Sequence, residues 1–259
     1  AEARPGYPIG VAGFPTVLQA VDLPNPTIFG PGDFGYPDES VAVAKDERFK
    51  ILIQPGEWFC DYYRPYCGDK LAPWPVGIDV EAWPDLSGGE KSLDFVVYDK
   101  IRWYRDERVP AILDALVAKL RADGRSVEVL RYGDHALGQY RSALSRARAL
   151  LFLCEHETQG IAYQEALASG VPVLAWDEGV LTDPKQIPFA APDLKVQSVP
   201  YFDERCGMTF KLDEFDKVYP EFWRSLASFR PRDYVLDRLS MEGAARAYLD
   251  LYRSIAPGR

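Results

Sequence analysis

An uninterrupted apolar run, ALLFLC at residues 149–154, constrains the fold of this chain more than any other feature. A strand that meets water on one face alternates apolar and polar residues, and this run has no polar face. A second such run, VPVLAW at 171–176, follows a helix-forming stretch that begins near Gly160 and closes at Gly170. Two buried strands around a helix predict a parallel sheet that is covered on both faces.

The same alternation begins earlier, from residue 92 onward. We predict strands at 93–99 and 126–133, a helix from Val109 until Gly124 stops it, and another helix at 136–148. Parallel strands joined by helices of this length need right-handed crossovers. The fold class is therefore α/β, with a Rossmann-like domain.

The N-terminal part is less regular, with a predicted strand at 50–53 and a helix that begins near Glu57. A stretch rich in Pro and Gly, LAPWPVGIDVEAWPDLSGGEKS, predicts a linker with its boundary near Gly77. Apolar residues at helical spacing in 240–255 predict a long terminal helix. We expect a partial N-terminal domain at 1–77, a ligand-binding domain at 78–235, and a terminal segment at 236–259 that packs back on the first domain.

Composition excludes several classes of protein. The net charge of −9 argues against a nucleic-acid binder, because phosphate backbones select basic surfaces. No apolar run is long enough to span a bilayer, although peripheral membrane contact stays possible. The four cysteines lack zinc spacing and His135 and His156 are too few for a metal site, so we expect no metal. Reduced thiols favour the cytoplasm.

Two glutamates, Glu157 and Glu165, flank the start of the helix that follows the buried run. Ligands of open parallel sheets bind beyond the carboxyl ends of the strands, where loops lead into helix N-termini. Unpaired N–H groups near Gly160 and Ile161 favour an anion such as a diphosphate. Carboxylates can accept paired hydroxyl hydrogens from a sugar or ribose. The alternative is that both glutamates are solvated charges at a helix start.

The E-x7-E element followed by ALASGVPVLA resembles the retaining family-4 glycosyltransferases of the GT-B fold. The resemblance extends over roughly residues 50–255, from ILIQPGEWFCDYY to the final helix. It implies that the second domain binds a nucleotide-sugar donor. By this resemblance Glu157 approaches the donor sugar and Glu165 the ribose, while backbone amides of Gly160 and Ile161 support the sugar or phosphate.

The family also clasps the diphosphate with an Arg and a Lys, five residues apart, after the first strand of this domain. The Arg falls on Arg102, but the Lys falls on Glu107, and the usual glycine before the Arg is Ile101. These departures leave the second phosphate contact open. The residues that could replace the Lys are Lys100, Arg105 and Arg108. Arg102 itself could instead form a surface salt bridge.

Two further stretches are candidates for the donor site. The stretch FGPGDFGYP places Gly30, Gly32 and Asp33 where glycine-rich loops of the first domain face donor phosphates in this fold. A plain turn of Gly, Pro and Asp explains it equally well. At the end of another strand, Tyr132 and Gly133 are candidates to meet the nucleobase.

The resemblance implies a glycosyltransferase that moves a sugar from a nucleotide-sugar donor to an acceptor hydroxyl with retention. It requires no cofactor beyond the donor, and the acceptor is a glycan, a lipid-linked molecule or a small molecule. Catalysis rests on electrostatic stabilisation of the leaving diphosphate, with no protein nucleophile. A nucleotide-sugar epimerase of the same fold and a non-catalytic nucleotide-sugar-binding protein are the alternatives.

The first domain is short for this fold, since 76 residues precede Gly77. A complete domain has on the order of 100–200 residues. We therefore expect an incomplete or unusually small GT-B enzyme, in which donor binding survives and transfer to acceptor is weak.

Overall fold

A computed structural model describes residues 4–14, 23–32 and 36–256. The chain forms two compact units. Unit 1 contains residues 1–77, 183–195 and 241–259, and unit 2 contains residues 78–182 and 196–240. Residues 183–195, within the range predicted for the second domain, thus belong to unit 1 by their contacts.

Unit 2 is built on a five-stranded parallel sheet in the order β6-β5-β7-β8-β9. The strands are β5 (Leu93–Lys100), β6 (Val127–Arg131), β7 (Ala147–Cys154), β8 (Val173–Trp176) and β9 (Gly207–Phe210). The parallel α/β class predicted from the sequence is confirmed.

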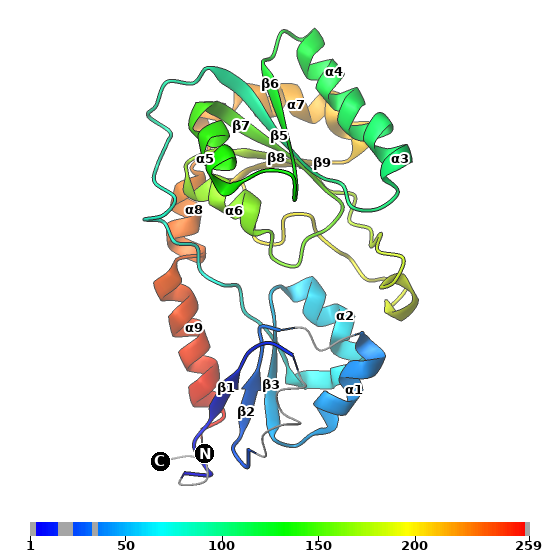
Figure 1. Cartoon of the computed structure of the whole chain (residues 1–259), viewed down its shortest axis with the longest axis vertical. Helices are drawn as coiled ribbons and strands as arrows, with labels where there is room; N and C mark the ends of the chain where they lie inside the picture. Colours follow the sequence, from blue (N-terminus) through cyan, green and yellow to red (C-terminus); the bar gives the residue numbers. More distant parts are fainter. Residues whose placement is uncertain (1–3, 15–22, 33–35, 257–259) are drawn as a thin grey trace. The chain divides into compact units, whose positions relative to one another are not determined.

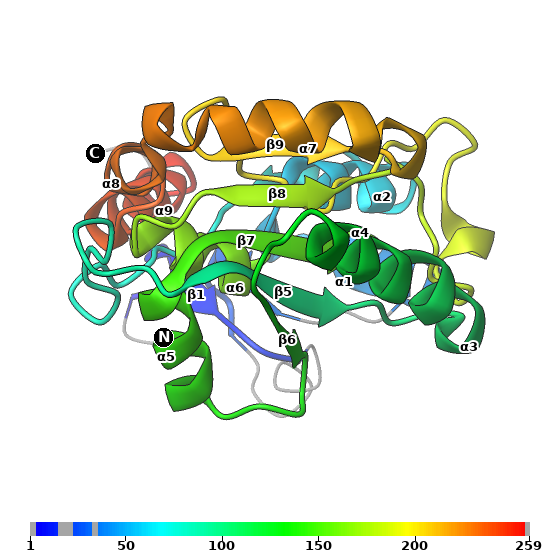
Figure 2. The ribbon, with the colours of Figure 1, turned by 90° about the horizontal axis from the view of Figure 1, so that it is seen from above.

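Strand β7 is central, as its apolar sequence predicts, and residues Ala149 to Cys154 are fully buried. One face of the sheet packs on α5 (Leu137–Arg146), α6 (Ile161–Ala168) and α8 (Pro231–Arg238). The other face packs on α4 (Ala115–Ala122) and α7 (Phe215–Arg224). Figure 2 shows the strands lying side by side, with α7 and α4 close to them.

Two predicted boundaries are wrong. The helix predicted to reach Arg148 ends at Arg146, because Ala147 already pairs with Leu93 and is fully buried. The helix predicted to begin at Val109 is preceded by α3 (Arg105–Arg108) and a π-helical turn at Val109–Asp114. Pro110 in that turn has no N–H to donate to a regular α-helical ladder.

Unit 1 holds a four-stranded parallel sheet in the order β1-β2-β3-β4. Its strands are β1 (Ile9–Val11), β2 (Thr27–Phe29), β3 (Phe49–Gln54) and β4 (Leu71–Pro73), and its first two helices are α1 (Pro37–Lys45) and α2 (Glu57–Cys67). Figure 1 shows α1 and α2 beside this sheet. Of these elements, only β3 and α2 were predicted. Strands β1, β2 and β4 have three residues each and leave almost no periodic signal.

Two later segments complete unit 1. In α9 (Met241–Ser254), the Ala244 carbonyl accepts a hydrogen bond from the Trp74 indole at 2.7 Å, and Tyr248 packs edge-on against the same ring. In segment 183–195, the carbonyls of Gln186 and Phe189 accept hydrogen bonds from the Tyr62 and Tyr66 hydroxyls at 3.3 and 3.1 Å.

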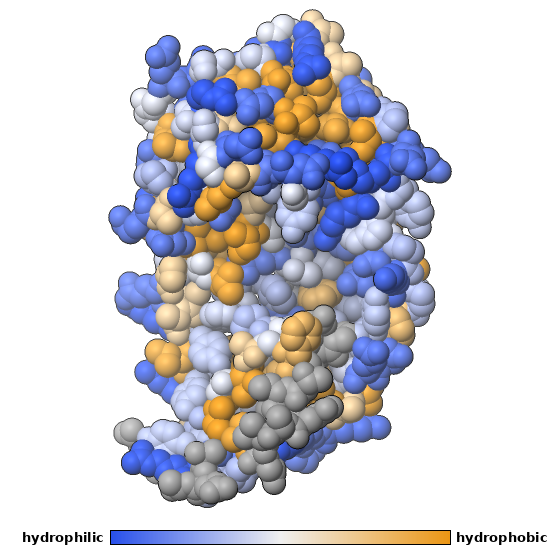
Figure 3. Space-filling view, in the orientation of Figure 1, coloured by the Kyte–Doolittle hydropathy of each residue, from blue (hydrophilic) through white to orange (hydrophobic). Residues whose placement is uncertain are grey.

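No helix in the described ranges is both long and apolar enough to cross a membrane. On the face drawn in Figure 3, hydrophobic side chains form several separate patches among hydrophilic ones.

Candidate functional site

The candidate site lies at the carboxyl edge of the unit 2 sheet. Lys100, Cys154 and Trp176 are the last residues of β5, β7 and β8, and Lys100 stands beside Cys154 in the parallel register. The loops that follow β5 and β7 carry Arg102, Glu157 and Gly160, three of the residues predicted to bind a donor. In open α/β sheets, this edge is where ligands bind.

A buried ion pair joins two of these residues. The Lys100 ammonium contacts the Glu157 carboxylate, and the two side chains are only 12% and 8% exposed. The Cys154 thiol donates to the same carboxylate oxygen at 3.4 Å, and the Tyr132 ring lies 4.3 Å from the ammonium. The structure therefore brings together Lys100, Tyr132 and Glu157, which are far apart in the sequence.

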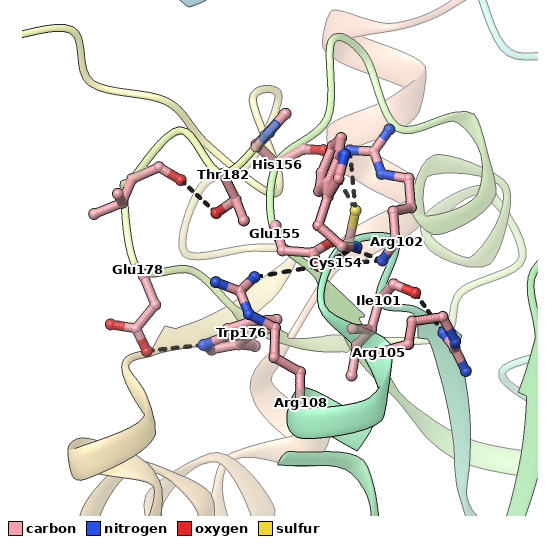
Figure 4. Close-up of polar contacts among 12 residues, drawn as sticks. Ile101, Arg102, Arg105, Arg108, Cys154, Glu155, His156, Trp176, Glu178 and Thr182 are labelled. Carbon is pink, nitrogen blue, oxygen red and sulfur yellow. Dashed lines mark hydrogen bonds and ion pairs between the residues drawn. The ribbon is translucent and has the colours of Figure 1, made fainter. Parts of the chain in front are cut away.

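Arg102 is held against the loop that carries Glu157. Its guanidinium donates to the His156 carbonyl and lies 4.2 Å from the centre of the Trp103 ring. The Trp103 and His156 rings stack at 4.7 Å. Burial, together with the Arg102 charge, lowers the pKa of His156 to about 3, so this imidazole is neutral in the folded protein. Figure 4 shows Arg102 and His156 of this cluster.

Two buried carboxylates that the sequence reasoning missed fix the loop around Arg102. Glu155 accepts the backbone N–H groups of Arg102 and Trp103 at 3.1 and 3.2 Å and pairs with Arg108 at 3.3 Å. Asp99 receives both terminal nitrogens of Arg105, at 3.0 and 2.7 Å. An acid directly after a buried apolar strand is the signal that could have revealed Glu155.

These contacts bear on the residues considered as replacements for the missing Lys. Arg105 is engaged by Asp99, and Arg108 by Glu155. Lys100 is engaged by Glu157. Each cation therefore already neutralises an acid at this edge, and phosphate binding by any of them stays a prediction.

Glu165 lies on α6, apart from the Lys100–Glu157 pair. Burial raises its pKa to about 7, although the Arg141 charge and a hydrogen bond with Trp83 oppose the shift. Tyr98, which is buried, feels the charges of both glutamates, and its pKa is raised, first by burial. The two acids therefore both lie close enough to one aromatic side chain to raise its pKa.

Gly160 and Ile161 form the start of α6. Gly160 has a φ of +82°, and a Cβ added there would come within 2.2 Å of the Tyr163 ring. The loop before it is fixed by Gln164, whose amide donates to the Gln159 carbonyl at 2.8 Å. Ile161 is partly exposed at the first turn, where helix N–H groups have no intrahelical acceptor.

Gly30 and Gly32 lie in unit 1, and Asp33 lies outside the described residues. A Cβ on Gly30 would come within 2.6 Å of the Ile53 carbonyl, and one on Gly32 within 2.1 Å of the Gly13 carbonyl. Close backbone packing within unit 1 explains both glycines. Their predicted contact with donor phosphates stays a prediction.

At the end of β6, Gly133 has a φ of +87°, and a Cβ added there would meet open space. Tyr132 beside it is exposed and donates its N–H to the Asp99 carbonyl at 2.9 Å. In the ranges that the structure describes, no group of three or more His, Cys, Asp or Glu side chains could hold a metal ion.

No protein-family model matches the sequence, and no curated protein matches it. Solved structures do match. TarM aligns with a TM-score of 0.60 at 11% identity, over 94% of this chain and 54% of its own. The catalytic domain of starch synthase IV from Arabidopsis thaliana, bound to ADP and acarbose, aligns with a TM-score of 0.60 at 12% identity. The alignment covers 97% of this chain and 73% of that domain. Sucrose-phosphate synthase from Thermosynechococcus elongatus aligns with a TM-score of 0.58 at 14% identity. The alignment covers 93% of this chain and 70% of the synthase.

These neighbours are GT-B glycosyltransferases. The chain has a GT-B-like fold. It spans about half the length of TarM and about seven-tenths of the two synthases. At this level of identity the likeness extends to the fold alone.

Gly160 and Gly133 form a matched pair for testing the start of α6. Alanine at either position must adopt the left-handed backbone conformation of the glycine, which is strained. Only at Gly160 does the new Cβ also meet a buried ring. We expect Gly160→Ala to lower the free energy of unfolding by roughly 1–3 kcal/mol more than Gly133→Ala, the cost of overpacking. Urea denaturation of both variants measures this, and equal losses would contradict it.

The raised pKa of Glu165 makes a second prediction. Between its ordinary value of 4.5 and about 7, the folded protein holds a proton that the unfolded chain releases. The contribution of Glu165 to the free energy of unfolding therefore falls as the pH rises through this window. We expect Glu165→Gln to raise the melting temperature more at about pH 8 than at about pH 5. Thermal melts at the two pH values decide it, and an equal change at both would refute the assignment.

Proposed function

We propose that this protein is a glycosyltransferase that moves a sugar from a nucleotide-sugar donor to an acceptor hydroxyl with retention of anomeric configuration. The observation that carries the proposal is the buried Lys100–Glu157 ion pair beside the start of α6. A buried pair of this kind is costly to desolvate and weak evidence of a stabilising role, so a functional role is favoured. The GT-B-like fold supports the same assignment.

In this proposal the diphosphate lies between Arg102 and the N-terminus of α6. The guanidinium is held by the His156 carbonyl, and its loop by Glu155, so its position is set before a ligand arrives. The N–H groups of Ile161 and Ala162 face the same anion, favoured by the helix dipole. Fixed donors of this kind stabilise charge on the leaving group without reorganisation.

The two glutamates bind different parts of the donor. Glu157, oriented by Lys100, accepts hydroxyl hydrogens of the sugar, and Glu165 accepts those of the ribose. Tyr132 and Gly133 lie at the end of β6 for the nucleobase. Because the pKa of Glu165 is about 7, its carboxylate form is available near neutral pH.

The remaining parts of the proposal rest on the resemblance. The leaving phosphate takes the acceptor proton on one face of the sugar, so no protein nucleophile is needed. The acceptor is a glycan, a lipid-linked molecule or a small molecule. The four cysteines are free and buried, which is compatible with a cytoplasmic protein.

Incubation with a panel of UDP-, ADP- and GDP-sugars tests the function. Release of nucleoside diphosphate only when an acceptor is present, with the product anomer retained, supports transfer. An altered nucleotide sugar without acceptor indicates an epimerase instead, and binding without turnover indicates a non-catalytic protein.

Arg102 gives a more specific prediction. We expect Arg102→Gln to weaken binding of a nucleoside diphosphate by about 1.5–3 kcal/mol, the range for hydrogen bonds to charged groups, and to spare the nucleoside. Arg121→Gln, at an exposed position near the end of α4, is the control. Titration calorimetry with both ligands measures the difference. Equal losses for the two ligands would make Arg102 a structural residue.

A further inference from the structure

A cavity of about 220 Å³ opens at the carboxyl ends of β7 and β8, and neither Lys100 nor Glu157 lines it. It is lined by Arg108, Glu155, Trp176, Glu178, Val180 and Thr182. Figure 4 shows the Arg108 side chain reaching from α3 toward Glu155, with Glu178 and Thr182 on the other side. None of Trp176, Glu178 and Thr182 has a role in the proposed function.

Glu178 is held in a fixed orientation. Its Oε1 accepts the Trp176 indole N–H at 2.8 Å and the Leu212 backbone N–H at 2.9 Å. Within the part of the chain that the structure describes, its second oxygen, Oε2, makes no hydrogen bond. The cavity therefore presents a preoriented carboxylate oxygen as an acceptor.

Hydrogen-bond donors stand on the opposite side. Arg108 donates a hydrogen bond to Glu155 through Nη1 at 3.3 Å, and its guanidinium lies 5.5 Å from the centre of the Tyr104 ring. Its side chain is 29% exposed, and its other N–H groups make no further hydrogen bond among the described residues. Thr182 makes one long hydrogen bond, from Oγ1 to the Val180 carbonyl at 3.4 Å. Its hydroxyl can still accept a hydrogen bond, because a hydroxyl oxygen has two lone pairs.

Charge selects the kind of ligand. An anion would meet the carboxylates of Glu155 and Glu178, and a cation would meet the Arg108 guanidinium. A neutral hydroxyl group donates to one side and accepts from the other, which matches this arrangement of donors and acceptors. Val180, which is 60% exposed, adds apolar surface for the carbon face of a ring.

Size limits the ligand further. Sites for drug-sized molecules have volumes of about 300–1,000 Å³. At about 220 Å³ the cavity is too small for a whole nucleotide sugar and has room for one ring.

We propose that this cavity is a second sugar subsite, which binds a neutral, hydroxyl-rich ring of monosaccharide size through Arg108, Glu178 and Thr182. The inference rests on the proposed function for the source of the ring: because the donor sugar is proposed to bind Glu157, the ring in this cavity is the terminal sugar of an acceptor. Its hydroxyl groups bind Glu178 Oε2, Thr182 Oγ1 and the N–H groups of Arg108.

The Trp176 indole N–H is a reporter inside the cavity. We label the six tryptophan indoles with ¹⁵N, assign Trp176 with the Trp176→Phe variant, and titrate methyl glucoside, methyl galactoside and N-acetylglucosamine. At least one of these sugars should shift the Trp176 signal and leave Trp223, on α7, unchanged. Failure of all three to shift Trp176 would overturn the proposal.

Matched variants connect the shift to the proposed contacts. Thr182→Val should weaken binding of that sugar by about three- to tenfold, the value of one hydrogen bond, and Glu178→Gln by about tenfold or more. Thr209→Val and Glu221→Gln, at exposed positions on β9 and α7, are the controls and should bind as the unaltered protein does. Unchanged affinity in both cavity variants would overturn the subsite.

A second titration uses UDP-glucose, UDP-N-acetylglucosamine and ADP-glucose beside the bare nucleotides. If the nucleotide sugar shifts Trp176 and the bare nucleotide does not, the ring is the donor's, and the assignment of this cavity to the acceptor is overturned. If it is the acceptor's, free sugar still shifts Trp176 when the nucleotide sugar is bound. Sugar binding at Trp176 without any nucleotide binding would support the subsite and reject the proposed function. Nucleotide binding without sugar binding at Trp176 would reject the subsite and leave the proposed function supported.

Discussion

The burial of β7 on both faces determines the organisation of unit 2. A strand with no polar side needs a neighbour on each edge and helices above and below, and β5 and β8 with two layers of helices supply them. Parallel neighbours place all their carboxyl ends at one edge. The polar residues that follow the strands therefore converge there without any local sequence signal to join them.

The same burial determines the electrostatics of that edge. Acids and bases that leave a dry sheet cannot be fully hydrated, so they neutralise one another: Lys100 with Glu157, Arg105 with Asp99, and Arg108 with Glu155. Removing one partner of such a pair leaves an uncompensated charge, which typically costs about 3–5 kcal/mol. The loops are consequently held in defined positions, and a ligand that binds there meets groups that are already oriented.

Sequence reasoning found the parts of the structure that have a strong local pattern. The apolar runs predicted β7 and β8, and the positions of the glycines predicted the start of α6. It missed β9, because GMTF is short and its Gly207 approaches the Val173 carbonyl closely, a contact between distant segments. It named Lys100 and Glu157 but not their pairing, and it overlooked Asp99 and Glu155. Those roles depend on the register of β5 with β7, which no local spacing encodes.

The chain passes between the two units at 77/78, 182/183, 195/196 and 240/241, four times in all. Neither unit is therefore one continuous stretch of sequence. In evolutionary terms, a single recombination point cannot exchange the sheet that carries the candidate site for another with different specificity. Each exchange must cut at 77/78, on both sides of segment 183–195, and again before α9. Diversification of this fold is then easier through point substitutions and loop changes within unit 2 than through the shuffling of whole domains.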